Sequence, residues 1–351
     1  MTPEALVQIQ QRLPSLQGKF MSIHSVNIIE IAEVRQHPNA DRLEIIPVGG
    51  WQAVTKKGQF TVGDRAVYVE PDYTVPTDRA EFSFLAKAGK DRHRLKAVRL
   101  RGELSYGLLI PVPAEVAEQP VGANVMEALG VARWEPDVKL TMADELPQDQ
   151  WPETFAPKFD IESYEKFPHV IAEGEPVVVT EKVHGANARY TVVNGVFYQG
   201  SRQRWLIPNS GHIWARAAAH NPSIEAWCAA NPGVTLYGEV YGNVQSLTYG
   251  LGKGEVRFIA FAAVDHGRWR DQGPLFDELQ AAGITCCPVL HVGPFDHGHI
   301  KRLAEADSQV AGSPGHMMEG VVIVPESERF HGSIGRVAVK HISNRYWESN
   351  D

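Results

Sequence analysis

The sequence has few cysteines, no long apolar run and no secretion signal. Its 351 residues include three cysteines, Cys228, Cys286 and Cys287, and no C-x-x-C pair. This set predicts neither a disulfide framework nor a zinc site, and it favours a reducing compartment. No apolar stretch is long enough to span a bilayer, and residues 1–20 lack the basic-then-apolar order of a signal peptide. We therefore expect a cytoplasmic protein that does not enter a membrane, and we expect it to act as a monomer.

Positive charge is also scarce over the whole chain, but it is dense in one segment. The net charge is −8, and 43% hydrophobic with 22% charged residues is the composition of an ordinary globular protein. Residues 87–102, KAGKDRHRLKAVRLRG, nevertheless carry seven Lys or Arg residues and one Asp. A local basic stripe can contact phosphates or can be a solvated face, and both readings stay open. We predict nucleic-acid contacts for Arg92, Arg94, Arg99 and Arg101.

Turn residues divide the N-terminal part of the chain into short strands. Residues 1–20 fit a short amphipathic helical segment. Residues 21–113 alternate short strands with Gly, Pro, Asn and Asp turns, which predicts a small all-β barrel. Within it, VRQHPNADRLEIIPVGG (34–50) resembles the opening of tRNA-binding OB-fold modules. OB folds bind single-stranded nucleic acid through one face or serve only as scaffolds.

The rest of the chain changes composition twice. Residues 114–169 are acidic and rich in Pro and Glu, and we interpret them as a linker. Residues 170–351 alternate strands and helices, which predicts a mainly antiparallel α+β domain. We therefore predict an α+β protein in which an OB-like barrel precedes a larger mixed domain.

A lysine stands at the end of an apolar strand in VVVTEKVHGANARYTV (177–192). The apolar ends of this stretch predict a β-hairpin, yet Lys182 lies between them, where a charged amine is costly to desolvate. A lysine has a pKa of about 10.4, and lowering that pKa to about 7 requires the protein to destabilise the charged ammonium form by roughly 4 kcal/mol. Apolar surroundings, cations or a metal can supply that amount and make the amine a nucleophile.

Further polar residues follow in a fixed order downstream, and the series resembles a known family. The order is K-x-H-G-x-N, S-R, G-E-x-x-G, F-x-x-F, E-G-V-V-I and V-K. This series resembles motifs I, Ia, III, IIIa, IV and V of ATP-dependent RNA ligases. The predicted domain order is similar to the Deinococcus and Naegleria type of nick-sealing RNA ligase. The resemblance covers residues 21–348.

The resemblance implies roles for the residues of the first motif. Lys182 would attack the α-phosphate of ATP and carry AMP, and His184 would be needed near the phosphate. Asn187 would contact the ribose or the water shell of the metal, and Glu181 the edge of the adenine. Gly185 would bring the backbone close to the nucleotide, because it has no Cβ to clash.

The later motifs imply the remaining contacts. Arg202 would act on the phosphates of AMP and RNA, since its guanidinium is a planar fork for phosphate. Glu239 would hold ribose hydroxyls, and Phe261 would stack on adenine, whereas Phe258 is assigned to the core. Glu319 would contact a magnesium or manganese ion, because such an ion keeps most of its waters and needs few carboxylates. Lys340 would neutralise phosphate charge in the transition state.

The chain departs from the family pattern at two points. The family commonly has K-x-K in its last motif, but Ala338 occupies the first position, so either Arg336 or another residue replaces that lysine or one step is slower. No segment resembling motif VI follows Lys340, so pyrophosphate would need another means of orientation. Alternatives are a DNA ligase, a capping guanylyltransferase, or an RNA-binding OB protein without catalysis. His184 counts against the first two, which typically have K-x-D-G.

Overall fold

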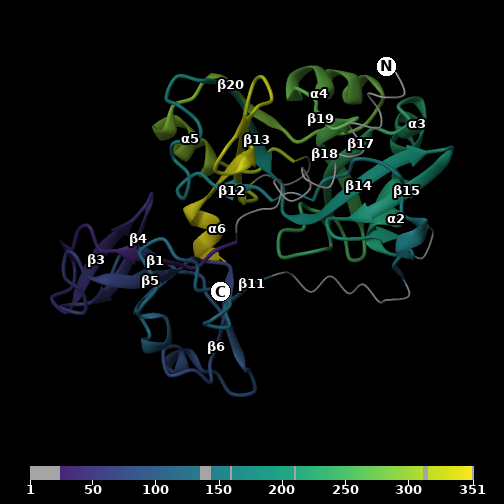
Figure 1. Ribbon diagram of the computed structural model, residues 1–351. Helices are drawn as coiled ribbons and strands as arrows, with labels where there is room; N and C mark the ends of the chain where they lie inside the picture. Colours follow the sequence, from purple (N-terminus) through teal and green to yellow (C-terminus); the bar gives the residue numbers. More distant parts are fainter. Residues whose placement is uncertain (1–23, 135–143, 159, 209–210, 311–314, 350–351) are drawn as a thin grey trace. The chain divides into compact units, whose positions relative to one another are not determined.

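The computed structural model describes residues 24–134, 144–158, 160–208, 211–310 and 315–349 (Figure 1). The helix predicted over residues 1–20 lies outside the described residues. The chain divides into two units, one formed by residues 23–136 with the last residues from Tyr346, the other by residues 137–345. Among the described residues, no helix is both long enough and apolar enough to cross a membrane.

The N-terminal unit is built from short antiparallel strands, as the turn pattern predicted. A tight Gly49-Gly50 turn, with Gly49 at a φ of 57°, joins the first long hairpin, which is typical of two-residue loops. Its four small sheets are β1(Asn27–Glu30)-β5(Arg65–Val69)-β10(Leu108–Pro111), β2(Arg35–Gln36)-β3(Leu43–Val48)-β4(Trp51–Lys56), β11(Ala132–Arg133)-β6(Tyr73–Pro76)-β7(Arg92–Arg94) and β8(Ala97–Leu100)-β9(Glu103–Tyr106).

The N-terminal unit extends further along the chain than the sequence indicated. Val116, Leu129 and Val131 are buried in one cluster with Ile28 on β1 and Val26 just before it. The linker predicted at 114–169 therefore does not begin at residue 114, because apolar side chains of its first part complete the core of this unit. Its acidic and proline-rich composition hid this role, since the buried residues are widely spaced.

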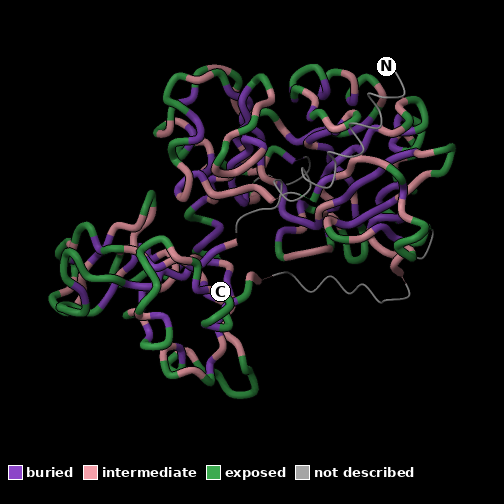
Figure 2. The backbone as a smooth tube through the Cα atoms, viewed as in Figure 1, coloured by how far each residue is buried: buried purple, intermediate pink, exposed green. Residues whose placement is uncertain are grey.

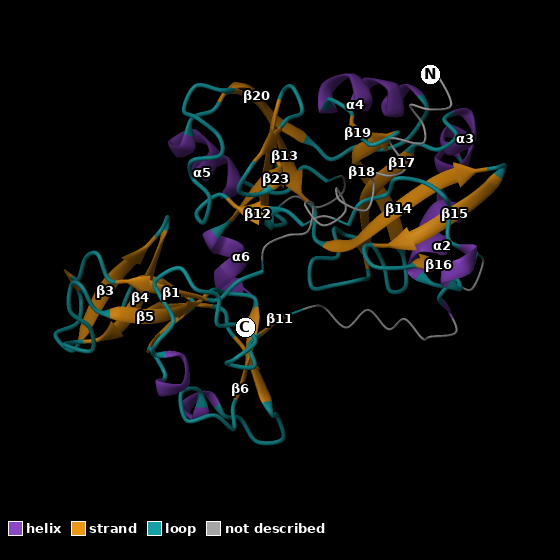
Figure 3. Cartoon of the chain, viewed as in Figure 1, coloured by secondary structure: helices purple, strands orange, loops and turns teal. Residues whose placement is uncertain are grey.

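Among its described residues the second unit contains two large sheets with their covering helices and a two-stranded sheet of β22(Phe330–His331) and β23(Gly335–Arg336) (Figures 1 and 3). The six-stranded sheet is antiparallel throughout, with the order β16(Trp205–Leu206)-β15(Val196–Ser201)-β14(Gly185–Val193)-β17(Thr235–Gly242)-β18(Val256–Asp265)-β19(Arg268–Trp269). The five-stranded sheet has the order β12(Glu162–Ser163)-β24(Val339–Ile342)-β21(Gly320–Pro325)-β13(Pro176–Lys182)-β20(Val289–Pro294), and only the pair β12–β24 is parallel. The helices are α2(Ile213–His220), α3(Ser223–Ala230), α4(Gln272–Ala281), α5(His297–Ala304) and α6(Asn344–Ser349), and α6 crosses the boundary between the units. This arrangement confirms the predicted mainly antiparallel α+β class.

The six-stranded sheet has one face covered by helices and one that carries polar side chains. Because successive side chains of a strand alternate, Tyr190 on β14 points to the face where α2 and α3 pack. Its hydroxyl donates to the backbone oxygen of Trp214 on α2 at 2.8 Å, and Phe258 packs edge-on against its ring. Figure 2 shows these central strands as buried backbone. The core assignment of Phe258 is therefore confirmed, and the opposite face, with Asn187 and Glu239, is the site face.

The stretch 177–192 is not a β-hairpin. β13 pairs with β20 and β21 in the five-stranded sheet, whereas β14 pairs with β15 and β17 in the six-stranded sheet. The chain therefore passes from one sheet to the other between Lys182 and Gly185. This crossing explains why a lysine ends an apolar strand, since Lys182 lies where the two sheets meet.

All three cysteines are buried and carry free thiols, so none forms a disulfide. Burial raises the pKa of the Cys286 thiol to about 12 and raises the pKa of the Cys228 thiol as well. A protonated, buried thiol is a poor nucleophile, so these side chains act as small core residues.

Candidate active site

The nucleophile candidate lies across a strand pair from the metal candidate. Lys182 is the last residue of β13 and is paired in register with Gly320, the first residue of β21. Glu319 immediately precedes Gly320, so backbone pairing places the two side chains together. Lys182 Nζ donates to Glu319 Oε1 at 2.7 Å, and the side chains are 22% and 9% exposed. Two residues 137 positions apart in sequence thus form one ion pair.

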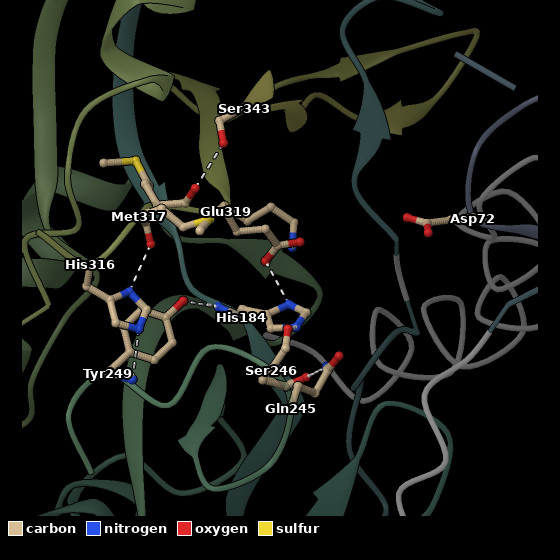
Figure 4. Close-up of polar contacts among 12 residues, drawn as sticks. Asp72, His184, Gln245, Ser246, Tyr249, His316, Met317, Glu319 and Ser343 are labelled. Carbon is tan, nitrogen blue, oxygen red and sulfur yellow. Dashed lines mark hydrogen bonds and ion pairs between the residues drawn. The ribbon is translucent and has the colours of Figure 1, made fainter. Parts of the chain in front are cut away.

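His184 completes this group from the other side. Its Nδ1 lies 3.3 Å from Glu319 Oε2, and its Nε2 lies 3.3 Å from the Ser246 hydroxyl (Figure 4). Burial by itself would raise the pKa of Glu319, but the charges of Lys182 and His184 outweigh it and lower that pKa to about 2. Glu319 is therefore an anion at any physiological pH, as a cation-binding carboxylate must be.

Two residues of the site face stand beside this group. Asn187 on β14 and Glu239 on β17 are directly paired, so their side chains share the site face. Burial raises the pKa of Glu239 to about 8, and the nearby negative Glu319 adds to the rise, while Lys182 and Arg202 oppose it. Lys182 and Arg202, which belong to two different motifs, therefore both lower the pKa of Glu239.

The raised pKa of Glu239 predicts a pH-dependent loss of stability. Its value of about 8 lies above the ordinary 4.5, so ionisation opposes folding as pH rises from about 4.5 to 8. Glu239→Gln is expected to gain up to about 4 kcal/mol over the wild type across that window. Urea unfolding at pH 5 and pH 8 measures the difference. Glu225→Gln, which alters an exposed carboxylate on α3, is the control, and an equal response of both variants to pH would contradict the assignment.

Arg202 is held by a residue outside the recognised motifs. Its guanidinium pairs with Asp160, in the segment predicted to be linker. This segment lies against the sheet, because the backbone oxygen of Ala156 accepts from buried Arg189 at 3.0 Å and that of Pro157 accepts from the Tyr237 hydroxyl at 3.0 Å. The sequence signal for Asp160 was weak, since one aspartate in an acidic, proline-rich stretch has no distinctive spacing.

Phe261 lies at the edge of a small buried cluster. It is partly exposed and packs against a buried cluster that includes Tyr237 and Trp269. In the pairing of β18 with β17, Ala260 faces Gly238 and Ala262 faces Tyr237, so Phe261 is an extra residue in β18. Such a bulge turns the side chain of Phe261 away from the direction that regular strand alternation would give it. The contact of Phe261 with adenine stays a prediction.

Glu181 and Lys340 lie on opposite faces of the five-stranded sheet. The register pairs Lys340 with Val322 and Val322 with Thr180, so Lys340 shares a face with Lys182, two residues beyond Thr180. Glu181 points to the other face and is 1% exposed. Its carboxylate accepts from the Ser308 hydroxyl at 2.5 Å and from the backbone N–H of Gln309 at 2.7 Å. Glu181 thus anchors the segment before β21, and the predicted adenine contact must compete with these donors.

Arg336 is not a substitute for the missing lysine. Its guanidinium forms an ion pair with Glu328 and lies 4.0 Å above the ring of Trp269, and both charged side chains are buried. These contacts fix Arg336 within the protein, so the suggestion that it replaces a phosphate-binding lysine at Ala338 is wrong. Ala338 itself is buried.

Gly185 is required by strand packing rather than by a ligand alone. A Cβ added at Gly185 would lie 2.1 Å from the backbone oxygen of Val240 on the neighbouring strand β17. No side chain fits there without moving one of the two strands. The role predicted for Gly185 at the nucleotide stays a prediction, while its packing role follows from the geometry.

The donor set at Glu319 fits a divalent cation that keeps most of its water. Both oxygens of Glu319 face cationic or polar groups, Oε1 toward Lys182 Nζ and Oε2 toward His184 Nδ1. Within the described part of the chain no group of three or more His, Cys, Asp or Glu residues could hold a metal ion directly. One anionic carboxylate suits hydrated Mg²⁺ or Mn²⁺ and does not suit a zinc cage.

Tyr249 and His316 clamp the turn that carries the first motif. The phenolic oxygen of Tyr249 accepts from the backbone N–H of His184 at 2.6 Å (Figure 4). The Tyr249 ring stacks on the imidazole of His316 with centroids 4.9 Å apart, and its backbone N–H donates to His316 Nε2 at 3.3 Å. His316 Nδ1 lies 2.9 Å from the backbone oxygen of Met317, two residues before Glu319. The pair therefore links the Lys182 turn to the residue that anchors the cation.

Removing the Tyr249 hydroxyl is expected to slow nucleotide uptake more than it weakens nucleotide binding. Tyr249→Phe leaves the buried N–H of His184 without its acceptor, which costs about 1–3 kcal/mol of stability. We expect the rate of covalent labelling to fall about tenfold, with the KM for ATP little changed, because the clamp orients the turn. The control is Tyr198→Phe, at a partly exposed ring beside Trp205. Equal rates for both variants would contradict a positioning role.

The arginines predicted to contact nucleic acid have partners within the N-terminal unit. Arg92 Nη2 donates to the backbone oxygens of Thr74 and Gly130 at 2.9 and 2.8 Å. The Arg94 guanidinium pairs with Asp72 at 2.6 Å and lies 3.4 Å above the Trp134 ring. Arg99 pairs with Glu348, and Arg101 lies in a turn with a φ of 50°. Their nucleic-acid contacts stay predictions, but at Arg92 and Arg94 a substitution would first disturb the strand β7.

Comparison with known proteins agrees with both units. Residues 175–342 match the family model of RNA ligases, and residues 25–112 match the model of an OB-fold domain. No curated protein matches the chain. A Naegleria gruberi RNA ligase with PPi is 26% identical, with a TM-score of 0.78 over 93% of this chain and 99% of that one. A mutant of that ligase with ATP and Mn is 26% identical, with a TM-score of 0.76 over 92% of this chain and 98% of that one. A second mutant, with AMP and Mn, is also 26% identical, with a TM-score of 0.77 over 92% of this chain and 97% of that one. The chain therefore joins an N-terminal OB-fold domain, matched over residues 25–112, to a nucleotidyltransferase-type RNA ligase domain, matched over residues 175–342.

Proposed function

We propose that this protein is an ATP-dependent RNA ligase that seals breaks between a 3′-hydroxyl and a 5′-phosphate through AMP bound covalently to Lys182. The observation that carries the proposal is the position of Lys182, at the crossing of two sheets and 2.7 Å from an anionic carboxylate. The Naegleria relatives bind ATP, AMP or PPi, which supports ATP as the nucleotide donor.

The first step forms a phosphorus–nitrogen bond. The Lys182 ion pair with Glu319 opens and the ammonium loses a proton to solvent, so that the Nζ lone pair of the free amine attacks the α-phosphorus of ATP. The bond from that phosphorus to the bridging oxygen breaks, pyrophosphate leaves with the electron pair, and a proton from the amine passes to solvent. Lys340, which shares a sheet face with Lys182, neutralises charge on the phosphate.

Two further transfers complete the reaction. An oxygen of the 5′-phosphate at the break attacks the same phosphorus, the phosphorus–nitrogen bond breaks, and Lys182 regains its proton. The 3′-hydroxyl then attacks the 5′-phosphorus and loses its proton to solvent, while the bond from that phosphorus to the bridging oxygen breaks and AMP leaves with the electron pair. Arg202, oriented by Asp160, offers two parallel donors to the phosphates in these steps.

The remaining site residues bind and orient the nucleotide. Glu239 and Asn187 would hold the ribose, Phe261 would stack on adenine, and His184 would hold Glu319 in place. Glu319 would hold a hydrated Mg²⁺ or Mn²⁺, which when bound neutralises charge on the α-phosphate. No lysine stands at Ala338, so the chain handles this charge with one cation fewer than K-x-K enzymes.

The substrate we propose is a nicked duplex whose 3′-hydroxyl strand is RNA. The test compares sealing of nicks that differ only in the terminal 3′-hydroxyl nucleotides, ribo or deoxyribo, with ATP, GTP or NAD as donor. We expect sealing with ATP on the ribonucleotide nick and a sharp fall on the deoxyribonucleotide nick. Equal rates on all-DNA nicks would favour a DNA ligase, and labelling by GTP alone a capping-type enzyme.

A further inference from the structure

The basic segment of the N-terminal unit divides into two sets of side chains. β7 is an extended strand, so Arg92 and Arg94 point to one face and His93 to the other. The two arginines are engaged with β6, Gly130 and Trp134, as described above. His93 therefore lies on the side of β7 away from these contacts.

Lysine charges gather on the His93 side. Burial lowers the pKa of His93, and the positive charges of Lys87, Lys90 and Lys96 lower it further. Lys87 and Lys90 are exposed and face each other across a tight turn, with the N–H of Lys90 donating to the backbone oxygen of Lys87 at 3.1 Å. No atom lies within 4 Å of a Cβ added at Gly89, so the turn projects into solvent.

An exposed aromatic ring is fixed next to this turn. Phe84 is 67% exposed, in the 3₁₀ turn η1 (Ser83–Leu85) that ends two residues before Lys87. Phe82 on one side is fully buried in the core of the unit, and Leu85 on the other packs against that core. These two anchors hold the turn in place, so Phe84 is presented to solvent on a rigid base.

We propose that Phe84, Lys87 and Lys90, here called the Phe84 surface, bind a single-stranded stretch of RNA. A ring on a fixed base stacks on an unpaired nucleobase, and lysines beside it neutralise the neighbouring phosphates, which is how OB folds hold single strands. Exposed phenylalanine gains nothing from duplex RNA, whose bases are already stacked. The inference rests on the proposed function in that RNA is the substrate, and it assigns the nucleic-acid contact to the lysines rather than to Arg92 and Arg94.

The lysines are tested by charge reversal and salt dependence. Binding of 5′-phosphorylated single-stranded RNA is measured over a range of salt for the wild type, Lys87→Glu/Lys90→Glu and a control, Lys56→Glu/Lys57→Glu. The control makes the same charge change at another exposed turn of the unit, closed by the N–H of Gln59 on the oxygen of Lys56. We expect Lys87→Glu/Lys90→Glu to bind about tenfold more weakly than the control, and its slope of log affinity against log salt to fall by about 1.4.

The aromatic ring is tested by truncation. Phe84→Ala is expected to weaken RNA binding about tenfold, from the loss of one stacked base, whereas Val62→Ala should not. Val62 is a matched control because it is 66% exposed in the same unit. Covalent AMP uptake should be the same in all four variants.

The outcomes separate this inference from the proposed function. Equal RNA affinity in the Phe84 surface variants and their controls overturns the inference, whether the surface is solvated or binds a protein. In that case, wild-type AMP uptake and sealing leave the proposed function intact. Failure of the wild type to take up AMP overturns the proposed function instead, while the same RNA-binding comparison still decides on the Phe84 surface.

Discussion

Lys182→Ala and Lys182→Arg are both expected to abolish sealing, with a loss on the order of 10⁴-fold or more. Alanine removes the nucleophile. Arginine keeps a positive charge next to Glu319, but a guanidinium stays protonated and cannot attack phosphorus. Sealing of a 3′-hydroxyl/5′-phosphate nick in RNA measures the effect. The control is Lys253→Ala, at an exposed lysine of the same unit, which should seal as the wild type does.

The arginine variant separates loss of chemistry from loss of fold. Removing one partner of a buried ion pair costs about 3–5 kcal/mol when both groups are fully buried, and less here because Lys182 is 22% exposed. Lys182→Ala should therefore unfold at a lower temperature, whereas Lys182→Arg should recover part of that stability. A folded Lys182→Arg that seals at the wild-type rate would contradict the role of Lys182.

Glu319→Gln is expected to lower covalent nucleotide uptake by about 100-fold or more, since the variant has no anion to bind a cation. Glutamine keeps the shape of the side chain but leaves the ammonium of Lys182 without its 2.7 Å partner. The measurement is the rate of AMP uptake at several concentrations of Mg²⁺ and of Mn²⁺. An unchanged rate with an unchanged metal dependence would contradict Glu319 as the cation-binding residue.

The same substitution makes a second prediction about acid stability. The pKa of Glu319 is about 2 in the folded chain against an ordinary 4.5, so its stabilising effect is complete above about pH 4.5 and is lost as pH falls toward 2. The wild type should exceed Glu319→Gln by about 3 kcal/mol at pH 6, and the difference should shrink across that acid window. Urea unfolding of both proteins along a pH series measures it, and a constant difference would contradict the assigned pKa.

The residues chosen from the motif order lie close together in the fold, and their catalytic roles stay predictions. Lys182, His184 and Glu319 lie in contact. The charges of Lys182, Glu319 and Arg202 all act on the pKa of Glu239. What joins them is strand register, which sequence spacing alone does not reveal. The hairpin expected at 177–192 failed for that reason, since the partners of β13 and β14 come from distant parts of the chain.

Residues that act through others left little trace in the sequence. Asp160 orients Arg202 from a stretch that reads as linker, and Tyr249 with His316 clamps the Lys182 turn from two separate loops. Neither has a distinctive spacing. The basic stripe shows the converse, because composition counted Arg92 with Lys87, while Arg92 is bonded to Thr74 and Gly130 and Lys87 lies exposed in a turn. Composition shows how many basic residues a segment has, but the fold determines which of their side chains can contact a ligand.

The central claim is that Lys182 carries AMP, and one measurement tests it directly. The wild-type chain is incubated with α-labelled ATP and a divalent metal, denatured, and its labelled peptide is identified. The account predicts one label, on Lys182, sensitive to acid and stable to alkali as a phosphoramidate is. Absence of label after pre-bound AMP has been removed with pyrophosphate, or label on another residue, would contradict it.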